Sequence, residues 1–289
     1  MTQIVECTGL YHIYKTGTLE VVALQGLDLK VAEAEMVAVV GRSGSGKTTL
    51  MNILAALETP SAGQARVAGI DIVALNARAR LDYHRRVVGY VWQNARASLV
   101  AELTAAENIQ LPLLGTGLAR GERLSRTDSL LAMLKMGDRA DLRPASLSAG
   151  EQQRLAVAVA LANLPRLLLA DEPTAELDRA AAGRLLQDLA RLREELGITV
   201  LLVTHDPLVE RNVDRVVRIR DGRTSTETRW SGTADEAVAN ELVIMDRAGR
   251  IQIPGVHLEA LRLKDRVRIR RQGDRLVISR HDDEEEPGD

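Results

Sequence analysis

A glycine-rich loop between an aliphatic run and a helix-spaced segment sets the strongest limit on the fold. Residues 41–48 read Gly-Arg-Ser-Gly-Ser-Gly-Lys-Thr, which fits the pattern G-x-x-x-x-G-K-[ST]. The run VAVVG at 37–41 predicts a buried strand, and KTTLMNILAAL at 47–57 predicts a helix. Glycines let successive backbone N–H groups curl around phosphate oxygens, and the helix start adds positive potential. The loop therefore predicts a nucleotide-phosphate site in an α/β domain.

Further along the chain, two more aliphatic runs predict buried strands. They are RLLLADE at 166–172 and ITVLLVTH at 198–205, and an amphipathic segment at 184–197 predicts a helix between them. Buried strands separated by helices predict a mostly parallel, covered sheet. Asp171 and Glu172 end the first of these strands, where one carboxylate can hold Mg²⁺ and the other can deprotonate a water. Taken alone, such acidic residues often belong to a structural ion pair. Beside a phosphate loop, they predict the second half of a catalytic site.

A third motif identifies the class. Residues 147–154 read Leu-Ser-Ala-Gly-Glu-Gln-Gln-Arg, which resembles the LSGGQ signature of the ATP-binding cassette (ABC) ATPases. Ser148 stands where a helix N-cap would present its hydroxyl and backbone N–H groups to an anion. The resemblance implies that the signature closes on ATP held by a partner, in a head-to-tail homodimer with two ATPs. It implies an α/β P-loop NTPase domain with a helical subdomain over residues 1–225.

The resemblance also implies individual roles. Tyr14 lies where the family places an aromatic ring against adenine, with Tyr11 as the competing choice, and Asp178 resembles the aspartate that communicates across the dimer. The implied catalytic residues are Glu172 as general base, His205 as switch, Gln93 as sensor and Lys47 as charge stabiliser. The implied ligands of Mg²⁺ are Thr48, Gln93 and Asp171. The implied ATP contacts are Tyr14, Gly41, Ser43, Gly44, Ser45, Gly46, Lys47, Thr48, Thr49, Ser148 and Gly150.

Several stretches are similar to the MacB/LolD-type branch of that family. They are SGSGKTTLMNILAALETPSAG, LTAAENIQLPLL and the EQQR that follows the signature serine. This resemblance implies a permease partner of the MacB, LolD or FtsX kind, contacted by residues 94–113. The permease would export a substrate, release lipoproteins or transmit force without moving any substrate. The chain would then be cytoplasmic, peripheral at the inner face of the cell membrane.

Composition excludes several other classes. A formal net charge of −2 gives no bulk polycation for nucleic acid, and the single cysteine, Cys7, cannot form an internal disulfide. No apolar run reaches the roughly 18–20 residues of a membrane span, and no secretory signal is visible. Because the chain carries 45% apolar residues, it can bury a core, which the near absence of aromatics makes aliphatic.

Four positions depart from the family pattern. Ala149 replaces the first glycine of the signature, and we expect slower turnover if that position needs a positive φ or close approach to phosphate. Ala175-Glu176 and Val159 replace residues usual in the family. Because the implied catalytic residues are all present, we expect an active site.

The C-terminal part has a different character. A polar stretch at 226–239 predicts a linker, two hairpins are expected at 241–254 and 266–279, and residues 282–289 form an acidic tail. Residues 240–281 resemble the AbrB-like swapped-hairpin fold, which implies a small, mainly-β dimerisation module. The alternative is a soluble switch that regulates DNA through Arg250, Arg268, Arg270 and Arg271, because residues 246–280 carry a net charge of +6.

Overall fold

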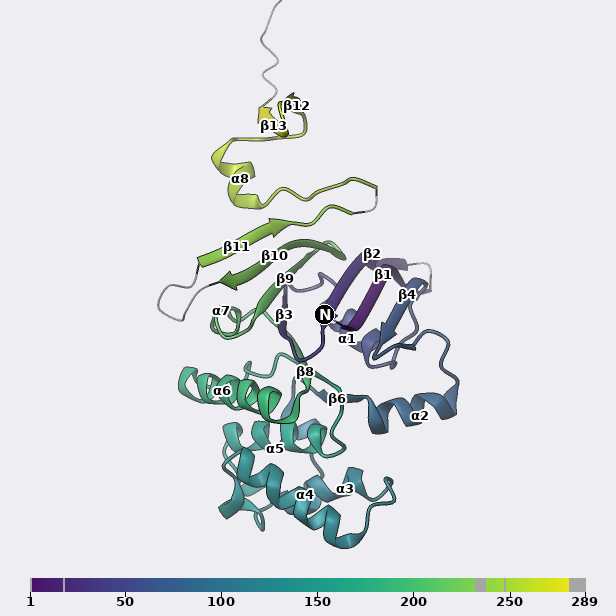
Figure 1. The fold of residues 1–289 in the computed structure, drawn as a ribbon, viewed down its shortest axis with the longest axis vertical. Coiled ribbons are helices and arrows are strands. Elements are labelled where there is room, and N and C mark those ends of the chain that lie inside the picture. The colour runs from purple at the N-terminus through teal and green to yellow at the C-terminus, as the bar shows by residue number, and fades with distance from the viewer. Residues whose placement is uncertain (1, 18, 232–237, 247, 281–289) are drawn as a thin grey trace, which may run out of the picture.

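The computed structural model describes residues 2–17, 19–231, 238–246 and 248–280. Its centre is a seven-stranded sheet in the order β11-β10-β9-β3-β8-β7-β6 (Figure 1). The pairs among β9, β3, β8, β7 and β6 are parallel, whereas β10 and β11 add to the β9 edge antiparallel. The strands are β3 (Met36–Val40), β6 (Val88–Val91), β7 (Leu167–Asp171), β8 (Thr199–Thr204), β9 (Arg215–Arg220), β10 (Arg223–Ser231) and β11 (Val238–Val243).

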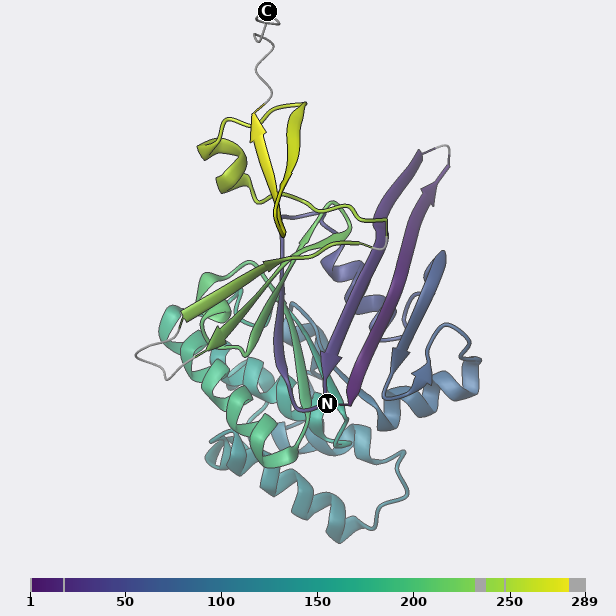
Figure 2. The ribbon, with the colours of Figure 1, turned by 45° about the horizontal axis from the view of Figure 1, so that its top comes forward.

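A second sheet of four antiparallel strands lies beside the first, in the order β2-β1-β4-β5 (Figure 2). Its strands are β1 (Gln3–Thr16), β2 (Leu19–Ala32), β4 (Ala62–Val67) and β5 (Ile70–Asp71). The helices are α1 (Lys47–Leu54), α2 (Ala77–Arg86), α3 (Ala105–Leu113), α4 (Arg120–Met133), α5 (Ala149–Leu161), α6 (Arg179–Leu196), α7 (Pro207–Glu210) and α8 (Gly255–Ala260). Helices α3, α4 and α5 gather at the end of the molecule opposite α8, as a helical subdomain (Figure 1).

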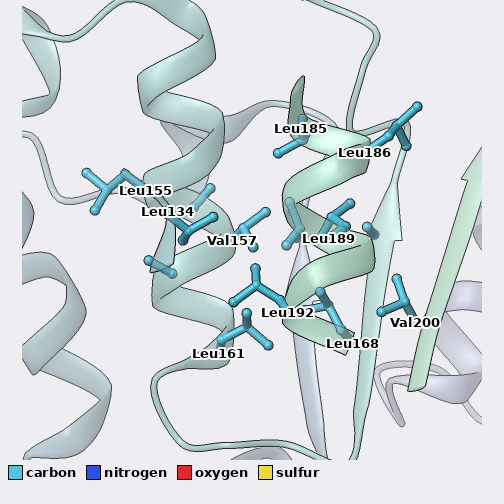
Figure 3. Close-up of a cluster of buried hydrophobic side chains, with 14 of the residues drawn as sticks. Leu134, Leu155, Val157, Leu161, Leu168, Leu185, Leu186, Leu189, Leu192 and Val200 are labelled. Carbon is cyan, nitrogen blue, oxygen red and sulfur yellow. The ribbon is translucent and has the colours of Figure 1, made fainter. Parts of the chain in front are cut away.

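The core has two parts, one on each face of the parallel strands. In β8, Val200 and Leu202 point to one face while Leu201 and Val203 point to the other, as strand geometry requires. On the first face, Val157 of α5 meets Leu189 of α6 (Figure 3). On the second face, α1 and the antiparallel sheet cover the strands. Because all these strands are covered on both faces, the sequence reads as continuous aliphatic runs.

The C-terminal segment differs in part from what its composition suggested. The linker expected at 226–239 is wrong for residues 226–231 and 238–239, because these residues pair as parts of β10 and β11. The remaining residues of that range, 232–237, lie outside the described chain. The threonines and tryptophan of β10 suit a strand, and Thr226 is buried beside β9. The hairpin expected at 241–254 is reduced to a single bridge, Met245 to Ile251, because β11 pairs with β10 instead.

The rest of this segment follows the expectation more closely. Helix α8 is followed by a two-stranded hairpin of β12 (Val267–Gln272) and β13 (Arg275–Arg280), which turns at Gly273-Asp274. The hairpin projects away from the rest of the molecule (Figure 2). The expected acidic tail at 282–289 lies outside the described residues. In the described part of the chain, no helix is long and apolar enough to cross a membrane.

Candidate nucleotide site

One cavity of about 620 Å³ brings most of the predicted site residues together. It opens at the carboxyl ends of β3, β7 and β8, with the tip of β1 at its side. The predicted residues in its wall are Tyr14, Gly41, Ser43, Gly44, Gly46, Lys47, Thr48, Thr49, Gln93, Asp171, Glu172 and His205. Segments separated by as much as 190 residues therefore meet where parallel strands end, which is the usual place for a ligand in such sheets.

The loop between β3 and α1 is shaped by its glycines. Gly46 has φ 97°, and a Cβ there would stand 2.5 Å from the carbonyl oxygen of Ala23. Only glycine fits that approach, so the loop can bring its N–H groups to one point at the start of α1. Lys47 Nζ donates to the carbonyl oxygens of Gly41 at 2.9 Å and Arg42 at 3.0 Å, which places the ammonium over the loop.

Ser45 belongs to the same loop, but its side chain is placed differently from that of Ser43. It is buried, it does not line the cavity, and its hydroxyl lies close to Gly41 with no hydrogen-bond partner among the described residues. Its backbone N–H donates to the carbonyl of Arg42 at 3.2 Å. The side chain of Ser45 therefore packs the loop from behind, while Ser43 faces the cavity.

The two carboxylates after β7 differ in environment. Burial, and then the charge of Glu172, raise the pKa of Asp171, while Thr48 and Lys47 oppose this rise. Glu172 has φ 46°, a left-handed backbone that costs a non-glycine residue on the order of 1 kcal/mol. Its backbone N–H is held by the carbonyl of Val203 at 2.8 Å. The strand end thus fixes Glu172 in a strained conformation that presents its side chain to the cavity.

His205 contacts Glu172 directly. Its Nδ1 lies 2.8 Å from Glu172 Oε1, and because an ionised carboxylate only accepts, Nδ1 carries the proton and donates. The imidazole is 74% exposed, whereas the Glu172 carboxylate is 12% exposed. The pair therefore leaves Glu172 half-buried as an acceptor and His205 exposed at the cavity.

Tyr14, not Tyr11, lines the cavity, and a network that the sequence did not suggest holds its ring. Its hydroxyl donates to Glu58 Oε2 at 2.6 Å and lies 3.2 Å from Thr49 Oγ1. The ring of His12 meets that of Tyr14 edge-on, with centroids 4.5 Å apart. No pattern in the sequence assigned a role to Glu58 or His12, so their contacts with Tyr14 could be found only from the folded chain.

The signature residues lie apart from the cavity. Ser148 is the N-cap of α5, and neither Ser148 nor Gly150 lines the cavity. Ala149 is the first residue of α5 and does not have a positive φ, so the first condition for slower turnover is not met, and close approach to phosphate stays a prediction. Asp178 caps α6, accepting from the N–H of Ala181 at 2.7 Å.

A larger cavity, of about 780 Å³, lies between β2 and the β9–β10 pair. The buried Arg215 lines this cavity and forms ion pairs with Glu35 at 2.8 Å and Glu227 at 3.0 Å. Because these charges already satisfy one another, we locate the chemistry in the smaller cavity, where Asp171 and Glu172 lie side by side.

Comparison with known proteins agrees with this geometry. A family model described as ABC transporter matches residues 24–175. The macrolide export ATP-binding/permease protein MacB of Syntrophobacter fumaroxidans is 42% identical over 227 residues, covering 78% of this chain and 32% of that protein. MacB of Escherichia coli O157:H7 is 40% identical over 261 residues, covering 90% of this chain and 40% of that protein. The chain thus spans about a third of the length of the curated relatives it matches.

Two solved structures are also similar. A dimeric ATP-binding cassette in a post-hydrolysis state, bound to ADP and Pi, is 36% identical with a TM-score of 0.72, covering 79% of this chain and 99% of the other. The cbiO1 protein of Clostridium perfringens, part of the ABC transporter complex cbiONQ, is 26% identical with a TM-score of 0.73, covering 82% and 90%.

Proposed function

The chain belongs to the ABC transporter family as an ATP-binding, ATP-hydrolysing cassette, and on this premise we propose that it energises a membrane permease of the MacB/LolD kind. The observation that carries this proposal is the meeting of Lys47, Glu172 and Gln93 around one cavity. The chain would act at the inner face of the cell membrane, and the permease would select what is moved.

A second copy of the chain completes the site. Ser148 caps α5 outside the cavity, so in a head-to-tail homodimer each signature would face the ATP held by the other copy. The similar cassette bound to ADP and Pi is dimeric. The hydroxyl of Ser148 and the N–H groups at the start of α5 suit the terminal phosphate of ATP.

Within the cavity, different residues would bind phosphate, activate water and bind adenine. Backbone N–H groups at Gly44 and Gly46 and the ammonium of Lys47 would hold the phosphate oxygens and stabilise their charge. The carboxylate of Glu172 would accept a proton from the water that attacks the terminal phosphorus. The hydrogen bond that His205 donates would fix the orientation of this carboxylate. The ring of Tyr14 would lie against adenine, held by Glu58.

The residues present also fit Mg²⁺. The hydroxyl of Thr48, the carboxylate of Asp171 and the amide oxygen of Gln93 are the oxygen ligands that this cation prefers, together with phosphate oxygens. Among the described residues, no cluster of three or more His, Cys, Asp or Glu side chains could hold a metal, which fits an ion that arrives with ATP. When bound, Mg²⁺ neutralises charge on the phosphates.

The segment after Gln93 would transmit the closure of the dimer to the permease. Arg96 Nε donates to Gln152 Oε1 of the signature helix at 3.1 Å, which links this segment to α5. Around α3, Leu111 is 44% exposed and Leu114 is 62% exposed, and we assign the contact with the permease to these apolar side chains. Closure of the dimer would therefore move the surface that touches the permease.

We assign the C-terminal hairpin to holding two copies together as an AbrB-like module. Ile269 and Leu276 lie on one face of the β12–β13 hairpin and are 59% and 69% exposed. A two-stranded hairpin is marginal alone in water, and a second copy could cover this face. Two of the arginines expected to contact DNA bond within the chain instead, Arg250 to Asp246 at 2.8 Å and Arg271 to the carbonyl of Gly273 at 2.9 Å.

Capture from native membranes tests the permease assignment. Tagged Glu172→Gln, incubated with Mg-ATP, should retain a permease with few membrane spans and a large outer domain, identified by mass spectrometry. The double variant Leu111→Asp/Leu114→Asp should lose that permease yet keep ATP hydrolysis in the otherwise unchanged chain, because these exposed side chains lie outside the cavity. Recovery of DNA or only the chain itself, with no permease, would refute the assignment.

A further inference from the structure

The signature serine is hydrogen-bonded to a charged neighbour. Ser148 Oγ donates to Glu151 Oε2 at 2.7 Å, and the Ser148 backbone N–H donates to the same oxygen at 2.8 Å. The bond from the Ser148 backbone N–H, together with the Glu151 N–H that donates to Ser148 Oγ at 3.4 Å, forms the capping box that begins α5. The single hydroxyl proton of Ser148 is therefore directed to Glu151, three residues further along the same helix.

Glu151 is in turn paired with an arginine from outside the motif. Arg139, in the short 3-10 helix Gly137–Arg139, donates from Nε to Glu151 Oε1 at 2.8 Å. This hydrogen bond is the main cause that lowers the pKa of Glu151 to about 2, followed by the bonds from Ser148. Glu151 is thus ionised at neutral pH, and Arg139 is the cation within ion-pair distance of it among the described residues.

This arrangement matters because the proposed ligand is an anion. If a second copy brings the terminal phosphate of its ATP to Ser148, a carboxylate three residues away would repel that phosphate. The guanidinium of Arg139 also donates to the exposed Asp138 at 2.7 Å, so it offsets part of this repulsion. It also holds Oε1, so Oε2 stays in place as Ser148 turns its hydroxyl.

We propose that Arg139 is a positioning residue of the composite site: it holds Glu151 and offsets its charge, so that Ser148 can transfer its hydroxyl hydrogen bond to ATP on a second copy. This inference rests on the proposed head-to-tail dimer. Arg139 itself does not touch the nucleotide; it acts through Glu151.

Release of labelled nucleotide tests the inference. In a Glu172→Gln background with Mg²⁺, methylanthraniloyl-ATP bound to the full chain is chased with excess ATP, and its release rate is compared with that of methylanthraniloyl-ADP. We expect Arg139→Ala to speed release of the labelled ATP on the order of tenfold, the size expected for one uncompensated charge about 5 Å from an anion in partly solvated surroundings. Release of labelled ADP should not change, because ADP lacks the phosphate that would reach the signature.

A second substitution distinguishes charge from folding. Glu151→Gln removes the charge and keeps an oxygen that can accept from Ser148, so Arg139→Ala/Glu151→Gln should restore slow release of ATP. Arg143→Ala, an exposed arginine of the same connection outside ion-pair distance of Glu151, should behave as the parent. Unchanged release in Arg139→Ala, failed rescue by Glu151→Gln, or equally fast release in Arg143→Ala would each overturn the inference. If the Glu172→Gln parent releases ATP as fast as ADP, the closed dimer itself is refuted, and the inference with it.

Discussion

Replacing Glu172 by glutamine is expected to lower ATP turnover by about a thousandfold while ATP binding persists. The carboxylate is the acceptor for the proton of the attacking water, and loss of such a base costs roughly 10²–10⁴ in rate. The glutamine amide keeps the size of the side chain but cannot accept that proton at neutral pH. Steady-state phosphate release and equilibrium binding of ATP, measured on the same preparation, separate the two effects.

Glu176→Gln is the matched control for this result. It makes the same chemical change four residues away, at an exposed position outside the cavity wall. We expect turnover like that of the unaltered chain. If Glu172→Gln also hydrolysed ATP at the unaltered rate, the general base would have to be another group, and the role assigned to Glu172 at the end of β7 would be wrong.

Lys47→Ala is expected to abolish hydrolysis by weakening ATP binding itself. A hydrogen bond to a charged group contributes about 1.5–3 kcal/mol, so losing the ammonium should raise the dissociation constant for ATP roughly 10- to 100-fold. Calorimetric titration with Mg-ATP measures this change.

Two controls accompany that titration. Lys264→Ala removes an exposed lysine from the C-terminal segment and should bind ATP normally. Because Lys47 also bonds to the carbonyls of Gly41 and Arg42, thermal unfolding must show that the Lys47→Ala chain remains folded. Normal affinity in a folded Lys47→Ala chain would contradict the role of this lysine.

Local patterns predicted much of this site, because the relevant chemistry is carried by short segments. Lys47 and Thr48 follow a glycine-rich loop, and Asp171 and Glu172 follow an aliphatic run, so their types and spacing place them at strand ends. The parallel sheet then brings these ends together. The same argument explains why β3, β7 and β8 were predicted within one residue at each end.

The remaining features depend on contacts of the folded chain, which the sequence motifs do not reveal. Glu58 holds Tyr14 across 44 residues, and Arg139 reaches Glu151 from a separate turn. The polar stretch of β10 becomes a strand because β9 offers an edge to pair with, and Ser45 turns behind its loop because Gly41 leaves room there. In each case, a contact that forms only on folding decides the outcome.

Complementation between two inactive chains tests most directly whether the site is shared between copies. Ser148→Arg should be inactive because it blocks the signature, and Glu172→Gln should be inactive because it lacks the base. In a mixed head-to-tail dimer, the intact Glu172 of one chain faces the intact Ser148 of the other, so one complete site forms. We predict that mixing the two chains restores ATP hydrolysis that neither shows alone. Continued inactivity of the mixture, or full activity of Ser148→Arg by itself, would contradict a site completed by a second copy.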